Sequence, residues 1–149
     1  MSKSNKTLHF VPLFFWMIII LFFSLQSGTQ SAQLSGGILS LISNVFESIG
    51  IIVDPSSLHF LIRKIAHFAE YAVLAILAMF ALRPYDFARE RKLTIVFVFG
   101  VLFAIFDESL QTLIPDRVGS PVDVMIDAVG TFFGLLIVKM HLKRKERSI

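Results

Sequence analysis

The sequence has no cysteine and few charged residues. Only 17% of its 149 residues are charged, against about 25% in a typical soluble domain. The lack of cysteine excludes disulfide scaffolds, thiolate metal sites and cysteine nucleophiles. The low charge, with 55% hydrophobic residues, argues against a disordered chain or an ordinary soluble enzyme. The sequence also lacks a P-loop, a G-x-S-x-G elbow and a dinucleotide-binding fingerprint.

Four long apolar stretches occupy much of the chain, at about residues 10–25, 58–82, 93–114 and 122–138. A helix needs roughly 20 apolar residues to cross a bilayer. We therefore predict an all-α membrane protein, with four transmembrane helices in one domain over residues 1–149. Lys3 and Lys6 precede the first stretch, as in a signal peptide, but its length and poor cleavage site favour an uncleaved span. Trp16 and the many phenylalanines of this span are predicted to face lipid.

Lysine and arginine are distributed asymmetrically. Eleven of the 14 lie before the first span, between residues 83 and 92, or after residue 138. Only Arg63, Lys64 and Arg117 fall on the other side of the predicted spans. The positive-inside rule places both termini in the cytoplasm of a bacterial cell, with the protein in the cytoplasmic membrane. Because the basic residues serve as topology signals, the pI of about 9.5 does not indicate nucleic-acid binding.

The outer loop, residues 26–57, contains an amphipathic segment. Its apolar residues recur at helical spacing, which predicts a helix of about three turns. They are Ile38, Leu39, Leu41, Ile42, Val45, Phe46 and Ile49. Such a helix would lie in the outer membrane interface or fold over the bundle as a lid. Asp54 to Ser57 then predict a turn and the N-cap of the second span.

Ionisable residues in three spans fall at a similar depth. At 1.5 Å per residue, they lie roughly 17–22 Å from the predicted cytoplasmic boundary. They are His67, Glu70, Asp107, Glu108, Asp123 and Asp127. Charged groups inside a bilayer are costly and usually mark a pathway or a site. The alternative is a buried ion-pair network that fixes helix register.

The helical faces of these residues also agree. One arc of roughly 80° on the second span carries His59, Arg63, His67 and Glu70. One arc of roughly 60° on the fourth carries Asp123, Asp127, Gly130 and Gly134. The two glycines let another helix approach closely, so this face is predicted to pack within the bundle. On the third span Asp107 and Gln111 share a face, and Glu108 points about 100° away.

The predicted layer holds more carboxylates than fixed cations. Its five carboxylates have only Arg63, Lys64 and Arg117 as candidate partners, with His67 as a further group. Carboxyl protonation, a charged His67 or a bound cation would each restore the balance. A divalent cation is thus compatible with the layer: oxygen ligands suit hard ions and His67 suits zinc. No H-E-x-x-H motif is present, so the metal prediction stays open.

Four short segments together resemble the VanZ-like family. They are FSLQS (residues 23–27), RKIAHFAEY (63–71), FDESLQTLIPDR (106–117) and DVMIDAVG (123–130). Their order and their placement in the spans make the resemblance specific, and it covers most of the chain. Two positions depart from the family's pattern: Asp127 stands where asparagine is common, and Asp116 where glycine is common. The resemblance implies a cell-envelope context, because the family is named for a protein that raises resistance to teicoplanin.

Three hypotheses about function follow. In the first, the protein binds a lipid-linked cell-wall precursor or a lipoglycopeptide at the outer leaflet. In the second, it is an intramembrane hydrolase or transferase with candidate catalytic residues His67, Glu70 and Asp107. His67 would be the general base or a metal ligand, and Glu70, Asp107 and Asp123 would hold a metal or a water. Arg63 or Arg117 would anchor a phosphate. In the third, a small proton-coupled transporter, the apolar inner halves of the spans argue against a path. The predicted ligand-binding residues are Arg63, His67, Glu70, Asp107, Glu108, Gln111, Arg117, Asp123 and Asp127.

Overall fold

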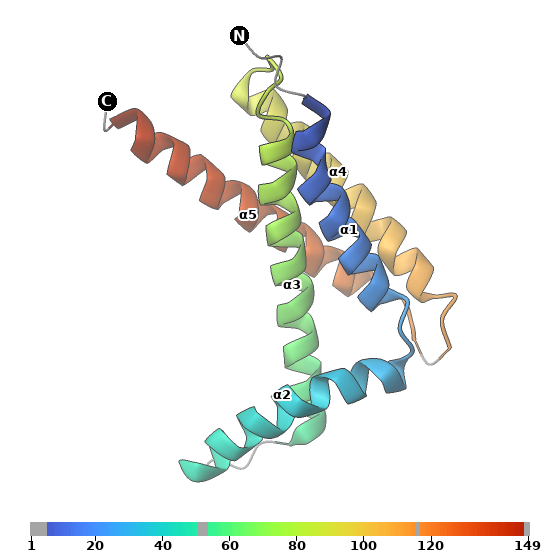
Figure 1. Ribbon diagram of the computed structural model, residues 1–149. Helices are drawn as coiled ribbons and strands as arrows, with labels where there is room; N and C mark the ends of the chain where they lie inside the picture. The colour runs from blue at the N-terminus through green and yellow to red at the C-terminus, as the bar shows by residue number, and fades with distance from the viewer. Residues whose placement is uncertain (1–5, 51–53, 116, 148–149) are drawn as a thin grey trace.

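The computed structural model describes residues 6–50, 54–115 and 117–147; the side chains of residues 28–35, 38 and 145–147 lie outside this description. The described chain is helical and contains no strand (Figure 1). Its elements are η1 (Lys6–Phe10), α1 (Val11–Ser24), α2 (Gly28–Ser48), α3 (Pro55–Ala81), α4 (Arg89–Gln111) and α5 (Pro121–Arg147). Asp116, one of the two departures from the family pattern, lies outside the described residues.

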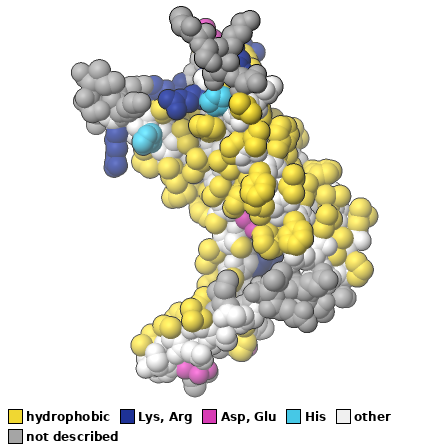
Figure 2. Space-filling model, in the orientation of Figure 1, with side chains coloured by type: hydrophobic (Ala, Val, Ile, Leu, Met, Phe, Trp, Pro, Cys, Tyr) yellow, Lys and Arg dark blue, Asp and Glu magenta, His cyan; other side chains and the backbone are white. Residues whose placement is uncertain are grey.

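Four helical segments are long and apolar enough to cross a membrane. They are Lys6–Ser24, Pro55–Ala81, Arg89–Gln111 and Pro121–Arg144. This confirms the prediction of an all-α protein with four candidate spans. Hydrophobic side chains cover much of the visible face of the bundle in Figure 2, as a lipid environment requires. Acidic and basic side chains come to the surface at the waist of the molecule, above α2.

The start of α3 is fixed by a cap. Asp54 has extended backbone geometry, and its carboxylate accepts a hydrogen bond from the Ser57 backbone N–H at 3.0 Å. The hydroxyls of Ser56 and Ser57 donate to the same oxygen. Pro55 occupies the first helical position, where its missing N–H costs nothing. The predicted N-cap is confirmed.

Helices α3 and α5 share the largest helix–helix interface of the described chain. Two glycines on α5 allow the close approach. A Cβ at Gly130 would lie 2.3 Å from the Phe68 carbonyl oxygen, and one at Gly134 would lie 2.2 Å from that of Ala72. Neither carbonyl can move without bending α3. The distance between these two helices is therefore set by glycine.

The hydrophobic core occupies one half of the bundle. Half of its buried members come from the C-terminal half of α3, and three more come from α4. They are Leu13, Ile20, Tyr71, Leu74, Ala75, Ala78, Met79, Ala81, Val96, Phe103, Ala104 and Leu135. The many alanines keep the helices close together here. The other half of the bundle holds the ionisable residues.

The first span contacts α3 and the loop that follows α3 at two levels. Near its start, the His9 and Phe80 rings lie 5.1 Å apart, and the Phe10 and Tyr85 rings 6.0 Å apart. Further along, the Trp16 indole N–H donates to the Glu70 backbone oxygen at 2.9 Å. Trp16, which was predicted to face lipid, is half-buried and packs against the core instead. An indole N–H in an apolar region needs an acceptor, and the α3 carbonyl supplies it.

Helix α2 runs crosswise at the end of α3, away from the core half (Figure 1). It spans 21 residues, longer than the three turns that the apolar pattern predicts. Leu41, Val45 and Ile49 are exposed at successive turns of one stripe. Neighbouring apolar side chains, among them Ile42 and Phe46, are half-buried. The described protein thus leaves an apolar stripe of this segment uncovered.

Candidate functional site

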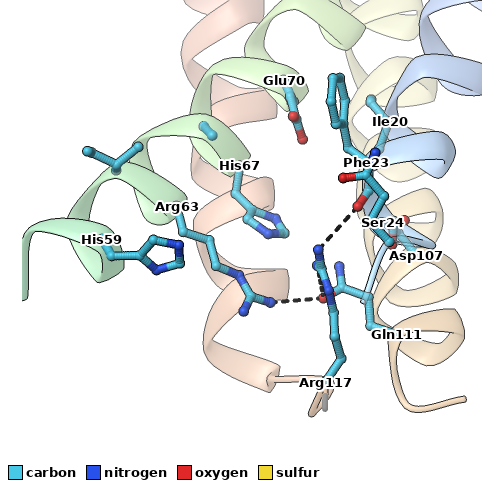
Figure 3. A pocket seen from close by; sticks show the side chains of 13 residues that line it. Ile20, Phe23, Ser24, His59, Arg63, His67, Glu70, Asp107, Gln111 and Arg117 are labelled. Atoms are coloured by element: carbon cyan, nitrogen blue, oxygen red, sulfur yellow. Dashed lines mark hydrogen bonds between the residues drawn. The ribbon is translucent and has the colours of Figure 1, made fainter. Parts of the chain in front are cut away.

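A cavity of about 420 Å³ lies between α1, α3, α4 and the α4–α5 loop. Its size is typical of small-molecule sites. Its lining residues are Ile20, Phe23, Ser24, Gln26, His59, Ile62, Arg63, Ala66, His67, Glu70, Asp107, Gln111 and Arg117. Figure 3 shows His67 and Arg63 of α3 on one side, with Gln111 and Arg117 on the other. The full predicted arc on α3, from His59 to Glu70, lines this cavity.

Two arginines meet at one neutral oxygen in the cavity. Arg63 donates from Nη2 to Gln111 Oε1 at 3.0 Å, and Arg117 donates from Nη1 to the same atom at 3.2 Å. Arg117 Nη2 also donates to the Phe23 backbone oxygen at 3.2 Å. Burial lowers the pKa of the Arg117 guanidinium, and the nearby Arg63 charge lowers it further. Two positive groups are thus held together without an intervening carboxylate.

Two carboxylates lie in the cavity wall beside these arginines. Glu70 projects from α3, and Asp107 projects from α4 one turn before Gln111. Asp107 is 1% exposed and lies beside Ser24 of α1. The lining therefore carries both signs of charge, with apolar side chains from α1 and α3 completing it. This mixed wall suits a ligand with an ionic group and an apolar part.

Lys64, the third cation predicted for this layer, forms its ion pair outside the cavity. Lys64 of α3 forms an ion pair with Asp123 in the first turn of α5. Asp123 is 2% exposed, so its charge is almost fully removed from solvent. The Lys64 ammonium also lies 4.8 Å from the centre of the Phe60 ring. Neither Lys64 nor Asp123 lines the cavity.

Two carboxylates outside the cavity lining lie close to His67. His67 Nδ1 is 3.2 Å from Asp127 Oδ1 on α5. Glu108 of α4 accepts a hydrogen bond from the Ser120 backbone N–H at 2.7 Å, just before α5 begins. One ligand atom each from His67, Glu108 and Asp127 lies within 4.8 Å of the others. These three residues could hold a metal ion.

The structure divides the predicted ligand-binding residues into two sets. Arg63, His67, Glu70, Asp107, Gln111 and Arg117 line the cavity. The other three lie outside the lining. Asp123 and Asp127 belong to α5, and Glu108 accepts a hydrogen bond from Ser120 just before α5 begins. In the described residues only Lys64, of the three predicted cationic partners, forms an ion pair with a carboxylate. Arg63 and Arg117 bind the amide of Gln111 instead.

Sequence reasoning missed the contribution of the first span. Phe23, Ser24 and Gln26 line the cavity, although none of them is ionisable. The FSLQS segment was the only sequence signal at this place. His59 was part of the predicted arc but was not among the predicted ligand-binding residues, and it also lines the cavity.

A protein-family model described as VanZ/LLP1 matches residues 8–142, which is most of the chain. The match includes α3, α4, nearly all of the first and fourth candidate spans, and every residue of the cavity lining. The comparisons with curated proteins and with solved structures gave no match.

Proposed function

The chain belongs to the VanZ/LLP1 family, and from this premise we propose that it is a cell-envelope membrane protein that binds an anionic amphiphile in its cavity. The observation that carries the proposal is the pair of arginines sharing one amide oxygen of Gln111. The ligand class is a lipid-linked cell-wall precursor or an acylated glycopeptide of the teicoplanin type. A role in teicoplanin resistance follows from this binding.

The arginine pair supports an anionic ligand group. A guanidinium has five N–H donors, and Gln111 offers one neutral oxygen to two of these groups. Within the described residues, Nε of Arg63 and Nε of Arg117 are buried without a hydrogen-bond partner. A phosphate or carboxylate has several acceptor oxygens and forms stronger, charge-assisted bonds with arginine. Such a group would satisfy donors that Gln111 leaves unpaired.

The apolar part of the lining supports an amphiphile rather than a free anion. Ile20, Phe23 and Ile62 contribute apolar surface to the same cavity. Phe23 is 44% exposed, so in a membrane its ring meets lipid tails. A ligand can therefore place its ionic group by the arginines and its chain along this surface.

The orientation of the protein is part of the proposal. With both termini in the cytoplasm, the half of the bundle that contains the cavity lies toward the outer leaflet. Helix α2 then lies at the outer interface, with its stripe of Leu41, Val45 and Ile49 toward lipid. Lipid-linked precursors and added glycopeptides would reach the cavity from this side.

Binding is tested on the full-length protein in lipid nanodiscs. The probes are a polyprenyl diphosphate, teicoplanin and the neutral polyprenol. Trp16, the single tryptophan of the chain, supplies a fluorescence signal near the cavity. Wild type should prefer an anionic probe over polyprenol. Gln111→Glu places a carboxylate between the arginines and should weaken anionic binding about tenfold or more, because the new charge competes for them.

The control for added charge is Asn44→Asp on α2, an exposed position outside the cavity. It should leave the affinity within about twofold of wild type, because solvent screens an exposed charge. Equal binding of polyprenol and both anionic probes would contradict the proposal. In cells, unchanged teicoplanin susceptibility on deletion and on overexpression would contradict the resistance role.

A second candidate function is an intramembrane hydrolase or transferase acting on the same ligand class. The observation that favours it is the His67 imidazole, which lines the cavity and has Asp127 behind it at 3.2 Å. A histidine oriented by a carboxylate is a common general base. The test is His67→Ala at normal protein abundance. Loss of phenotype with retained probe binding supports catalysis, and a full phenotype argues against it.

A further inference from the structure

Three helices bring one buried side chain each to a common point behind the cavity. His67 comes from α3, Glu108 from α4 and Asp127 from α5. One ligand atom of each lies within 4.8 Å of the other two. The three side chains are 7%, 4% and 0% exposed, respectively. This arrangement differs from the set expected from the sequence, in which Glu70, Asp107 and Asp123 were the oxygen ligands beside His67.

Two oxygens of this cluster lack partners. Glu108 uses Oε2 to accept from the Ser120 N–H, and Asp127 uses Oδ1 toward His67. Their other oxygens, Glu108 Oε1 and Asp127 Oδ2, are buried with no hydrogen-bond partner in the described part of the chain. A buried carboxylate oxygen without a partner is costly. The cost disappears if a cation binds at both oxygens.

The three cationic side chains predicted for this layer are engaged elsewhere. Lys64 pairs with Asp123, and Arg63 and Arg117 donate to Gln111. Two carboxylates and one imidazole thus share a buried space with no ammonium or guanidinium bonded to them among the described residues. A divalent cation would balance the two negative charges directly.

We propose that His67, Glu108 and Asp127 bind one divalent transition-metal ion, Zn²⁺ or Mn²⁺. Imidazole nitrogen suits zinc, and carboxylate oxygen suits manganese and zinc. Three protein ligands are typical of sites that keep one position open. Ca²⁺ fits less well because it prefers six to eight oxygens. The inference rests on the proposed function in one respect only: His67 also lines the cavity, so the ion lies at the wall of the ligand site.

The Ser120 backbone N–H orients one carboxylate of the proposed site, that of Glu108. It holds Glu108 Oε2 at 2.7 Å, immediately before the first turn of α5. Such hydrogen bonds orient metal-binding carboxylates and increase their affinity. At Gly119, a Cβ would come within 2.5 Å of the Glu108 backbone oxygen, so the loop lies tightly against α4. Glu108 is therefore positioned from both its side chain and its backbone.

Metal binding is measured directly on the full-length protein in detergent. The protein is stripped with EDTA, dialysed against ZnCl₂ or MnCl₂, and analysed for metal per chain by mass spectrometry. Wild type should retain about one equivalent of Zn²⁺ or Mn²⁺. Asp127→Asn removes a charged ligand with little change in size and should weaken binding about tenfold or more. The matched control is Asp54→Asn, the same change at an exposed carboxylate outside the cluster, which should retain the metal.

The outcomes separate the metal site from the proposed function. Less than about a tenth of an equivalent in wild type overturns the metal site. Equal retention by Asp127→Asn and wild type overturns it too. If Asp127→Asn is not monodisperse, Glu108→Gln replaces it, with the same expectation. Probe binding by EDTA-stripped protein tests the arginine pair separately. Stripped protein that binds probe but never metal leaves the proposed function standing.

Discussion

The Lys64 ammonium and the Asp123 carboxylate form an ion pair that joins α3 to the first turn of α5. The two residues are 59 positions apart in the sequence. Asp123 is 2% exposed and the Lys64 side chain 16%. The pair lies in the same interface as the glycine contacts of α5. It fixes which residues of the two helices meet where α5 begins.

Removing one partner of this pair should be much worse than removing both. Lys64→Met leaves the Asp123 charge buried and unpaired, which should lower the free energy of unfolding by about 3–5 kcal/mol. Lys64→Met combined with Asp123→Leu should recover most of that loss, because no buried charge remains. Unfolding in mixed micelles, followed by circular dichroism, measures both. If the double variant is less stable than Lys64→Met, the pair does not act as described.

Gly134 should tolerate no side chain. In Gly134→Ala the new Cβ would lie 2.2 Å from the Ala72 carbonyl oxygen, so α3 and α5 must separate. We expect a loss of about 1–3 kcal/mol in the free energy of unfolding. The matched control is Gly36→Ala in α2, where a Cβ meets nothing within 4 Å. That variant should keep the stability of wild type or exceed it, since alanine favours helix. Equal melting temperatures for the two variants would contradict the close contact.

The cap of α3 should make its first turn sensitive to acid. Hydrogen bonds from the Ser56 hydroxyl and then from Ser57 lower the pKa of Asp54 below its usual value. The folded-state pKa is thus below the unfolded-state pKa. The cap therefore stabilises α3 fully above the unfolded pKa and loses this effect as pH falls through the folded pKa.

Amide hydrogen exchange of residues 55–60 measures this effect. In wild type, exchange corrected for its intrinsic pH dependence should accelerate between about pH 5 and pH 2. Asp54→Asn keeps a capping side chain but cannot titrate, so its corrected rates should stay flat over the same range. A flat wild-type profile would show that Asp54 does not cap the helix as a carboxylate.

The proposed orientation can be tested with single cysteines, because the chain has none of its own. Ser48→Cys lies at the exposed end of α2, and Asp86→Cys lies in the exposed α3–α4 loop. A membrane-impermeant maleimide should label Ser48→Cys on intact cells. It should label Asp86→Cys only after permeabilisation. The reverse pattern would invert the protein in the membrane and turn the cavity toward the cytoplasm.

Hydropathy predicted the four spans, but their ends required other information. The third span begins at Arg89, not at about residue 93, because the basic residues before its apolar part are good helix formers. For the same reason α5 continues past residue 138 to Arg147. The first ten residues of α2 are rich in Ser, Gly and Gln and have no apolar period, so the pattern missed them.

Helical geometry alone predicted which residues share a face of one helix. It could not predict which residues meet between helices, because that depends on how closely the helices approach and at what register. Arg63 therefore paired with Gln111 rather than with a carboxylate. Glu108, set about 100° from Asp107 on α4, proved to face Ser120 and α5 rather than the cavity. Backbone acceptors, such as the Glu70 oxygen for Trp16, carry no sequence signal at all.

The division of the bundle into a polar half and an alanine-rich core half limits how a ligand can move. The cavity draws on the first half of α3, and the tightly packed side chains from Tyr71 to Ala81 occupy the rest of that helix. Within the described residues, the tightly packed half of the bundle therefore closes one end of the cavity. A ligand of the proposed kind would enter and leave from the same side. Two amphiphiles of different chemistry would then compete for one place.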